Sequence, residues 1–192
     1  MKVTLREVLI PILIVLIIFA GMRFSLQGFG INGPSMLPDF HNGQDWLVNK
    51  LSYHFHDPQR GDVIVFHYPR NPKLLYIKRV IGLPGDHVKI TENGKIYIND
   101  YLLKEKPDRG LTDQIGSFCD VYLEKGEYFV LGDNRSSNTD PPYSSSDSRD
   151  WGPVPRKNIV GKTWLCYWPP SEWRFSPSYS WELSPSDSAT ME

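Results

Sequence analysis

The feature that most constrains this chain is an uncharged apolar run near its N-terminus. Val8 to Met22 contains no charged side chain, and Leu5 and Phe24 lie at the margins of the run. The stretch approaches the ~20 residues that an α-helix needs to cross a bilayer. We therefore expect residues 1–24 to form a single transmembrane anchor, with a separate domain following it.

The charges that flank this run predict its orientation. Lys2 and Arg6 precede it and only Arg23 follows closely, so the positive-inside rule favours a cytoplasmic N-terminus and an extracytoplasmic domain. The alternative is a secretory signal peptide that is removed. Against it, the run is long for such a peptide, and Arg23 and Phe24 stand where a small-residue cleavage site is expected. The sequence thus predicts a single-pass protein of the cell membrane.

Residues 25–170 show the pattern of an antiparallel all-β domain. Short runs rich in β-branched and aromatic residues alternate with Gly, Pro, Asn and Asp. Asn93-Gly94 predicts a hairpin with a two-residue turn, and Asn99-Asp100 predicts a further turn. The expected strands are 62–68, 74–81, 88–90, 95–98, 128–131 and 159–168.

Composition excludes some classes of function and leaves others open. The chain has 192 residues and a net charge of −1, which gives no basic face for nucleic acid. Cys119 and Cys166 allow at most one disulfide, and their apolar contexts favour two buried thiols. Residues 171–192 are rich in Ser and Pro, and we expect the end of this tail to be disordered. His54, His56 and His67 do not make up the three or four convergent ligands of a metal site.

A candidate nucleophile lies just after the apolar run. Ser35 sits within Gly33-Pro34-Ser35-Met36-Leu37-Pro38. A serine flanked by Gly and Pro usually belongs to a turn, so Ser35 alone is weak evidence for a site. It does not lie in the Gly-x-Ser-x-Gly elbow of α/β-hydrolases, because Leu37 occupies the last position.

A candidate base lies about forty residues further on. Lys78 is flanked by apolar residues in a predicted strand, with Arg79 the only polar neighbour. A free lysine has a pKa of about 10.4, and burial lowers that pKa by disfavouring the ammonium form. Because strand residues alternate between faces, Lys78 can enter an apolar pocket while Arg79 meets a carboxylate. A Ser-Lys pair is a known variant of the serine-protease arrangement.

These two motifs, together with residues 60–66, 132–135 and 146–152, resemble bacterial type I signal peptidases. The resemblance runs from the apolar segment to roughly Trp168. It implies a coiled antiparallel sheet fold, a Ser35 nucleophile with Lys78 as its base, an acyl-enzyme and no cofactor. It also implies a serine endopeptidase, expected to act as a monomer, that cleaves signal peptides from exported preproteins.

The resemblance also implies supporting residues. Ser145 would orient Lys78, and Asp147 would support the site through ion pairs with Arg79 and Arg149. The connection 136–146 is longer than is usual in the family, which leaves Ser144 and Ser146 as alternatives to Ser145.

The resemblance further implies where the substrate lies. An extended peptide would run beside Asn32 and Gly33 and beside Tyr76 and Ile77. Met36, Tyr76 and Ile77 would form shallow pockets for small side chains. Some relatives carry a hydroxyl where this chain has Gly33, so the Ser35 N–H is one oxyanion donor and the second is open.

Three other functions remain as alternatives. A self-cleaving Ser-Lys regulator shares the dyad, but such regulators lack a membrane anchor. An inactive anchored binding domain would not need both Ser35 and Lys78. A Ser-His-Asp triad lacks support, because neither His41 nor His87 has a carboxylate at a recognisable spacing.

Overall fold

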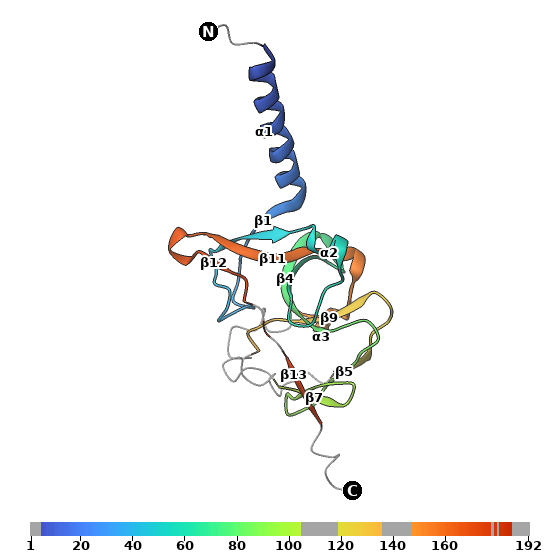
Figure 1. The fold of residues 1–192 in the computed structure, drawn as a ribbon. Coiled ribbons are helices and arrows are strands. Elements are labelled where there is room, and N and C mark those ends of the chain that lie inside the picture. The colour runs from blue at the N-terminus through green and yellow to red at the C-terminus, as the bar shows by residue number, and fades with distance from the viewer. Residues whose placement is uncertain (1–4, 105–118, 136–146, 178, 180, 186–192) are drawn as a thin grey trace.

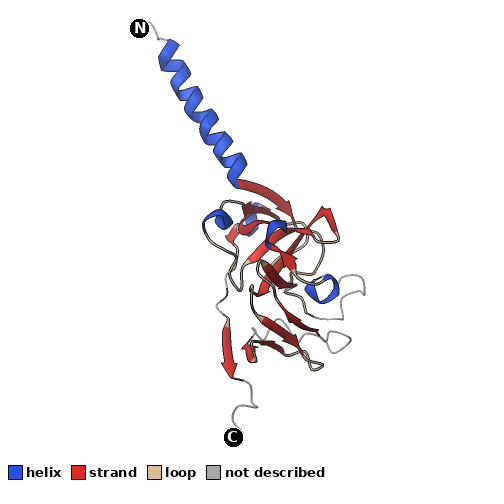
Figure 2. Ribbon diagram, turned by 90° about the vertical axis from the view of Figure 1, so that its right-hand side faces the viewer, coloured by secondary structure: helices blue, strands red, loops and turns tan. Residues whose placement is uncertain are grey.

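The computed structural model describes residues 5–104, 119–135, 147–177, 179 and 181–185. A single long helix precedes a domain made of two antiparallel sheets (Figures 1 and 2). The helix projects away from the sheets, and its last residue is followed directly by the first strand.

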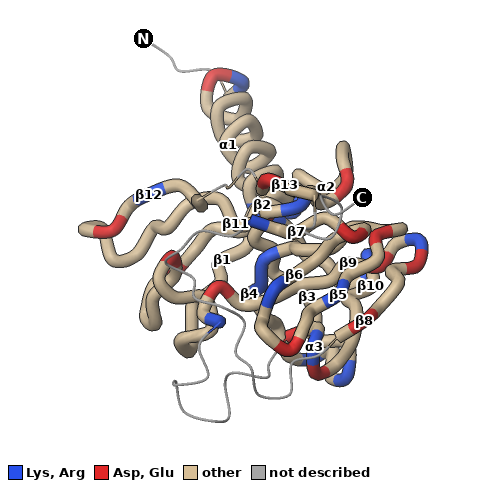
Figure 3. Tube along the Cα trace, turned by 90° about the horizontal axis from the view of Figure 1, so that it is seen from below, with Lys and Arg blue, Asp and Glu red and all other residues tan. Residues whose placement is uncertain are grey.

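The helix α1 (Leu5–Ser25) has the length and composition to cross a membrane. Its mean hydropathy is 2.5 and none of its residues is buried against the domain. The charged residues of α1 lie only toward its two ends, as Figure 3 shows for the end near the N-terminus. The helix continues through Pro11, which is tolerated in membrane helices.

The larger sheet lies next to α1 and follows the order β1-β2-β11-β3-β4-β9-β10, with β12 paired to β11. Its strand β4 is the longest and continues beyond the partner strand β9, whose pairs with it begin at Arg79. The strands of this sheet are β1 (Leu26–Gly30), β2 (Asp45–Asn49), β3 (Val63–Tyr68), β4 (Asn71–Gly82), β9 (Glu127–Leu131), β10 (Val154–Pro155), β11 (Ile159–Trp168) and β12 (Arg174–Phe175).

The smaller sheet lies at the end of the domain far from α1 (Figure 1) and has the order β13-β7-β6-β5-β8. Its strands are β5 (His87–Ile90), β6 (Ile96–Ile98), β7 (Tyr101–Lys104), β8 (Cys119–Tyr122) and β13 (Glu182–Pro185). The remaining elements are short helices: α2 (Ser52–Phe55), α3 (Ser148–Trp151), η2 (Arg156–Asn158) and η3 (Pro170–Glu172).

The all-β prediction is confirmed, and each of the six expected strands overlaps an observed one. The predicted hairpin around Asn93-Gly94 is confirmed, because β5 pairs with β6, but the predicted two-residue length of its turn is wrong. The Gly94 N–H donates to the Thr91 carbonyl and the Thr91 N–H to the Lys95 carbonyl, so the loop is longer and uses Gly94 at positive φ. The further turn predicted at Asn99-Asp100 is confirmed: it joins β6 to β7, and its φ values of 51° and 67° are positive, as a type I′ turn requires.

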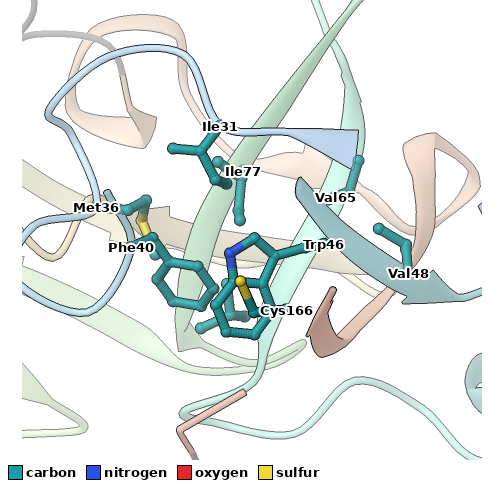
Figure 4. Packing of buried hydrophobic residues seen from close by; sticks show 9 residues of the cluster. Ile31, Met36, Phe40, Trp46, Val48, Val65, Ile77 and Cys166 are labelled. Atoms are coloured by element: carbon teal, nitrogen blue, oxygen red, sulfur yellow. The ribbon is translucent and has the colours of Figure 1, made fainter. Parts of the chain in front are cut away.

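A hydrophobic cluster between the larger sheet and the loop that carries Ser35 fixes that loop. Phe40 and Trp46 are fully buried, and their ring centroids lie 4.6 Å apart (Figure 4). Ile31 and Met36 pack into the same cluster, so buried side chains stand on both sides of Ser35. Each such side chain stabilises the fold by roughly 1.5–3 kcal/mol, which holds this loop to the sheet.

The two cysteines are both free thiols. Cys166 is buried in the same cluster as Trp46, and Cys119 is half-buried beside the core of the smaller sheet. They belong to different sheets, and neither lies in the groove described below.

Candidate active site

Ser35 lies in a tight loop between β1 and β2. Gly33 takes a φ of 106°, a conformation that favours glycine, and its N–H donates to the Asn42 Oδ1 at 3.1 Å. The Leu37 N–H donates to the Pro34 carbonyl at 3.1 Å. These bonds close the loop around Ser35 and present its hydroxyl toward β4.

Lys78 reaches this hydroxyl from β4. Its Nζ donates to the Ser35 Oγ at 2.7 Å. On the strand, Lys78 stands opposite Ile64 of β3, while the next residue, Arg79, makes a separate set of contacts with Asp133. The predicted split of Lys78 and Arg79 onto two faces is therefore confirmed.

Burial sets the charge state of Lys78. The residue is only 4% exposed, and this desolvation lowers its pKa from 10.5 to about 8. Asp147 and Asp133 oppose the shift because they favour the ammonium form, and Arg149 adds to it. Roughly a tenth of Lys78 is therefore neutral at about pH 7, a far larger fraction than for an exposed lysine.

A second loop holds the Ser35 loop from behind. The Asn134 N–H donates to the Ser35 carbonyl at 3.1 Å, and the Asn134 Nδ2 donates to the Pro34 carbonyl at 3.2 Å. A Cβ on Gly132 would lie 2.5 Å from the Ser35 carbonyl oxygen, so only glycine permits this approach. Residues 132–134 thus set the position of the Ser35 backbone.

Arg79 links the two loops through a buried charge cluster. Its Nε donates to the Asp133 Oδ1 at 2.7 Å and its Nη2 to the Asp133 Oδ2 at 2.6 Å, a bidentate pair with both side chains fully buried. The Nη2 also meets the Asp39 Oδ2 at 3.1 Å. The predicted pair between Arg79 and Asp147 is wrong, because Asp133 and Asp39 occupy the guanidinium.

Asp147 pairs with Arg149, as predicted. The Arg149 Nε and Nη2 donate to its two carboxylate oxygens at 2.8 and 2.7 Å. Asp147 also caps α3 by accepting from the Arg149 N–H at 3.1 Å. The two charges act on the pKa of Lys78 in opposite directions, since Asp147 raises it and Arg149 lowers it. Ser145, predicted to orient Lys78, lies outside the described residues, as do Ser144 and Ser146.

An open groove of about 290 Å³ lies in front of the Ser-Lys pair. Four of the five predicted substrate-binding residues, Asn32, Gly33, Tyr76 and Ile77, line it; Met36 does not, because it is 1% exposed and packs in the core. The complete lining is Phe29, Gly30, Asn32, Gly33, Pro34, Ser35, Leu75, Tyr76, Ile77 and Lys78.

Sequence reasoning missed some of these residues. The motif 132–135 was recognised, but no role was assigned to Asp133 or Asn134. Asp39 and Phe29 carried no signal, since their roles depend on which strands meet. His87 does have a carboxylate partner, Asp120, at 2.6 Å, but the pair belongs to the smaller sheet. No group of three or more metal-ligating side chains occurs within the described parts of the chain.

Comparison with known proteins agrees with this geometry. A model of the family described as "Signal peptidase, peptidase S26" matches residues 4–168. The chain belongs to this family.

Signal peptidases from several bacteria are similar to this chain over most of its length. It is 33% identical to signal peptidase I of Pseudomonas aeruginosa, over 88% of this chain and 74% of that protein. It is 34% identical to signal peptidase IB of Staphylococcus aureus, over 92% and 96%. It is 39% identical to signal peptidase I of Leptolyngbya laminosa, over 78% and 72%.

Proposed function

We propose that this protein is a membrane-anchored serine endopeptidase that cleaves N-terminal signal peptides from exported preproteins through a Ser35-Lys78 dyad. The observation that carries the proposal is the 2.7 Å hydrogen bond between Lys78 Nζ and Ser35 Oγ, made by a buried lysine at the wall of an open groove. Family membership supports the reaction class.

In this mechanism neutral Lys78 accepts the proton of the Ser35 hydroxyl as Oγ attacks the scissile carbonyl carbon. The resulting ammonium then donates that proton to the departing amine, which leaves an ester between Ser35 and the signal peptide. Lys78, neutral again, takes a proton from a water molecule that attacks the ester. Hydrolysis releases the signal peptide and returns the proton to Ser35. No cofactor enters these steps.

The Ser35 N–H is the proposed oxyanion donor. Among the described residues this N–H has no hydrogen-bond acceptor, and it belongs to the same residue as the nucleophile. Loss of one such donor typically costs about 10²–10³ in rate. Gly33 has no side chain with which to supply the second donor, so we propose a water molecule or the Gly33 backbone for that role.

The groove supports binding of an extended peptide. Leu75 to Ile77 pair with β3 along one edge, and β9 begins to pair with β4 only at Arg79. The other edge of Leu75 to Ile77 is therefore open for a peptide strand, between β4 and the Phe29–Gly30 end of β1. We propose that Tyr76 and Ile77 on the groove wall form shallow pockets that accept small side chains at the positions before the cut.

Helix α1 is the proposed anchor, with a cytoplasmic N-terminus and the sheets on the extracytoplasmic side, where signal peptides emerge. We propose that the protein works as a monomer, since the groove and the Ser-Lys pair come from one chain. Ser145 is retained as the proposed orienting residue of Lys78, next to Asp147 and Arg149.

Removal of either member of the dyad is expected to abolish cleavage. Ser35→Ala and Lys78→Ala should lower kcat/KM by about 10⁴-fold or more. Lys78→Arg should be equally inactive, because arginine does not lose its proton at working pH. Lys73→Ala is the matched control, since Lys73 lies exposed on the same strand. The assay is cleavage of a preprotein in detergent, and turnover near wild type in either alanine variant of the dyad contradicts the proposal.

The pH dependence should follow the protonation of Lys78. Only neutral Lys78 is a base, and its pKa is lowered to about 8, so kcat/KM should rise about tenfold per pH unit below this value and level off above it. If the base were a lysine with the ordinary pKa of 10.5, kcat/KM would instead keep rising up to about that pH. Between about pH 6 and 8 the protonated form of Lys78 dominates. A kcat/KM that stays constant over this range would rule out Lys78 as the base.

The orientation can be tested with a membrane-impermeant maleimide on spheroplasts. Lys73→Cys should be labelled without permeabilisation, because Lys73 is exposed on the domain. Lys2→Cys should be labelled only after permeabilisation, and the unmodified chain gives the background of its own two thiols. The reverse pattern would overturn the proposed topology.

A further inference from the structure

The chain beyond the part that matches the family contacts the buried charge cluster of Arg79. The match ends at residue 168, whereas residues 169–185, which we call the C-terminal strap, run from the sheet beside α1 to the far sheet (Figures 1 and 2). On the way the described residues of the strap pass the charge cluster of Arg79, Asp133 and Asp39.

Tyr179 makes two kinds of contact with this cluster. Its hydroxyl donates to the Asp39 carboxylate, at 2.8 Å from Oδ1 and 3.0 Å from Oδ2. Its ring lies against the Arg79 guanidinium, whose central carbon is 4.8 Å from the ring centroid. Hydrogen bonds to charged groups and cation–π contacts are both strengthened where water is excluded.

The strap also supplies a backbone acceptor. The Arg79 Nη1 donates to the Gly61 carbonyl at 2.8 Å and to the Pro177 carbonyl at 3.4 Å. The Arg79 side chain is fully buried, so each of these acceptors replaces lost water. Tyr179 and Pro177 thus close the side of the cluster that faces the strap.

The strap is fixed on both sides of Tyr179. Before it, β12 pairs with β11, and the Ser176 N–H donates to the Trp164 carbonyl at 2.8 Å. After it, β13 pairs with β7. Between these strands the strap packs so closely on Gly61 that a Cβ there would lie 2.6 Å from the Tyr179 carbonyl oxygen.

The cluster joins the two loops that position the nucleophile. Asp39 follows Ser35 in one loop, and Asp133 precedes Asn134, which holds the Ser35 carbonyl, in the other. Arg79 bridges both carboxylates and is the strand neighbour of Lys78. A shift of Asp39 would therefore be passed to Ser35 along four residues of a tight loop.

We propose that Tyr179 is a positioning residue for the reaction: by holding Asp39 against Arg79, it fixes the Ser35 loop relative to Lys78. This inference rests on the proposed function of the Ser35-Lys78 pair. Tyr179 does not line the groove, so it acts on the position of the nucleophile and not on peptide binding.

The test is steady-state cleavage by the full-length Tyr179→Phe protein in detergent. Phenylalanine keeps the ring on Arg79 and removes only the hydroxyl. We expect kcat to fall roughly five- to tenfold, since misplacement of a reacting group by about 1 Å costs up to ~10²-fold. KM should stay within about twofold, because the groove is unchanged. Tyr179→Leu, which also removes the ring, should lose more.

A double-mutant comparison isolates the hydroxyl contact. In an Asp39→Asn background, Tyr179→Phe should cost less than it does in the wild type, because its charged acceptor is already gone. Trp173→Phe is the control from the same strap: its ring is 67% exposed and its Nε1 bonds the Tyr167 carbonyl. That variant should keep wild-type kcat.

The outcomes separate this inference from the proposed function. If the wild type fails to cleave, or if Ser35→Ala cleaves, the proposed function falls and the role of Tyr179 falls with it. If the wild type cleaves and Tyr179→Phe retains its kcat, or raises KM alone, only the inference about Tyr179 is overturned. A lower melting temperature with unchanged kcat per active site would make Tyr179 merely structural.

Discussion

The site depends on one hydrogen bond made by a buried lysine, that between Lys78 Nζ and Ser35 Oγ. In water a lysine holds its proton and a serine hydroxyl is a poor nucleophile. Burial of Lys78 raises the free energy of the ammonium form and lowers its pKa to about 8. The surrounding charges also affect this pKa: Asp147 and Asp133 raise it and oppose the effect of burial.

Much of the remaining structure fixes the position of Ser35 relative to Lys78. The Ser35 loop is held by the Phe40–Trp46 packing on one side and by Asn134 on the other. The buried pair of Arg79 and Asp133 fixes the strand that carries Lys78 to the loop that carries Asn134. A buried ion pair of this kind adds little to stability, but loss of one partner is costly. Here the ion pair acts mainly by holding the Lys78 strand and the Asn134 loop in a fixed relative position.

The sequence predicted the elements whose signals are local. The apolar run predicted α1, the β-branched runs predicted the strands, and strand alternation predicted separate contacts for Lys78 and Arg79. The contacts that could not be predicted are made between residues that lie far apart in the sequence. Arg79 was assigned to Asp147 by resemblance, yet β9 brings Asp133 beside it. Met36 was predicted to line the groove, but its side chain is buried in the hydrophobic core. The Gly94 turn differs because Thr91 and Lys95 bond across it.

The most direct test of the account is the pKa of Lys78 itself, measured in the full chain in detergent micelles. An NMR titration of labelled lysine ε-methylene groups can follow it, with the Lys78 signal identified by its absence in Lys78→Ala. The account predicts a midpoint near 8, well below the ordinary lysine pKa of 10.5. A midpoint at the ordinary value of 10.5 would contradict it, because Lys78 would then be charged throughout the working range and unable to accept the Ser35 proton.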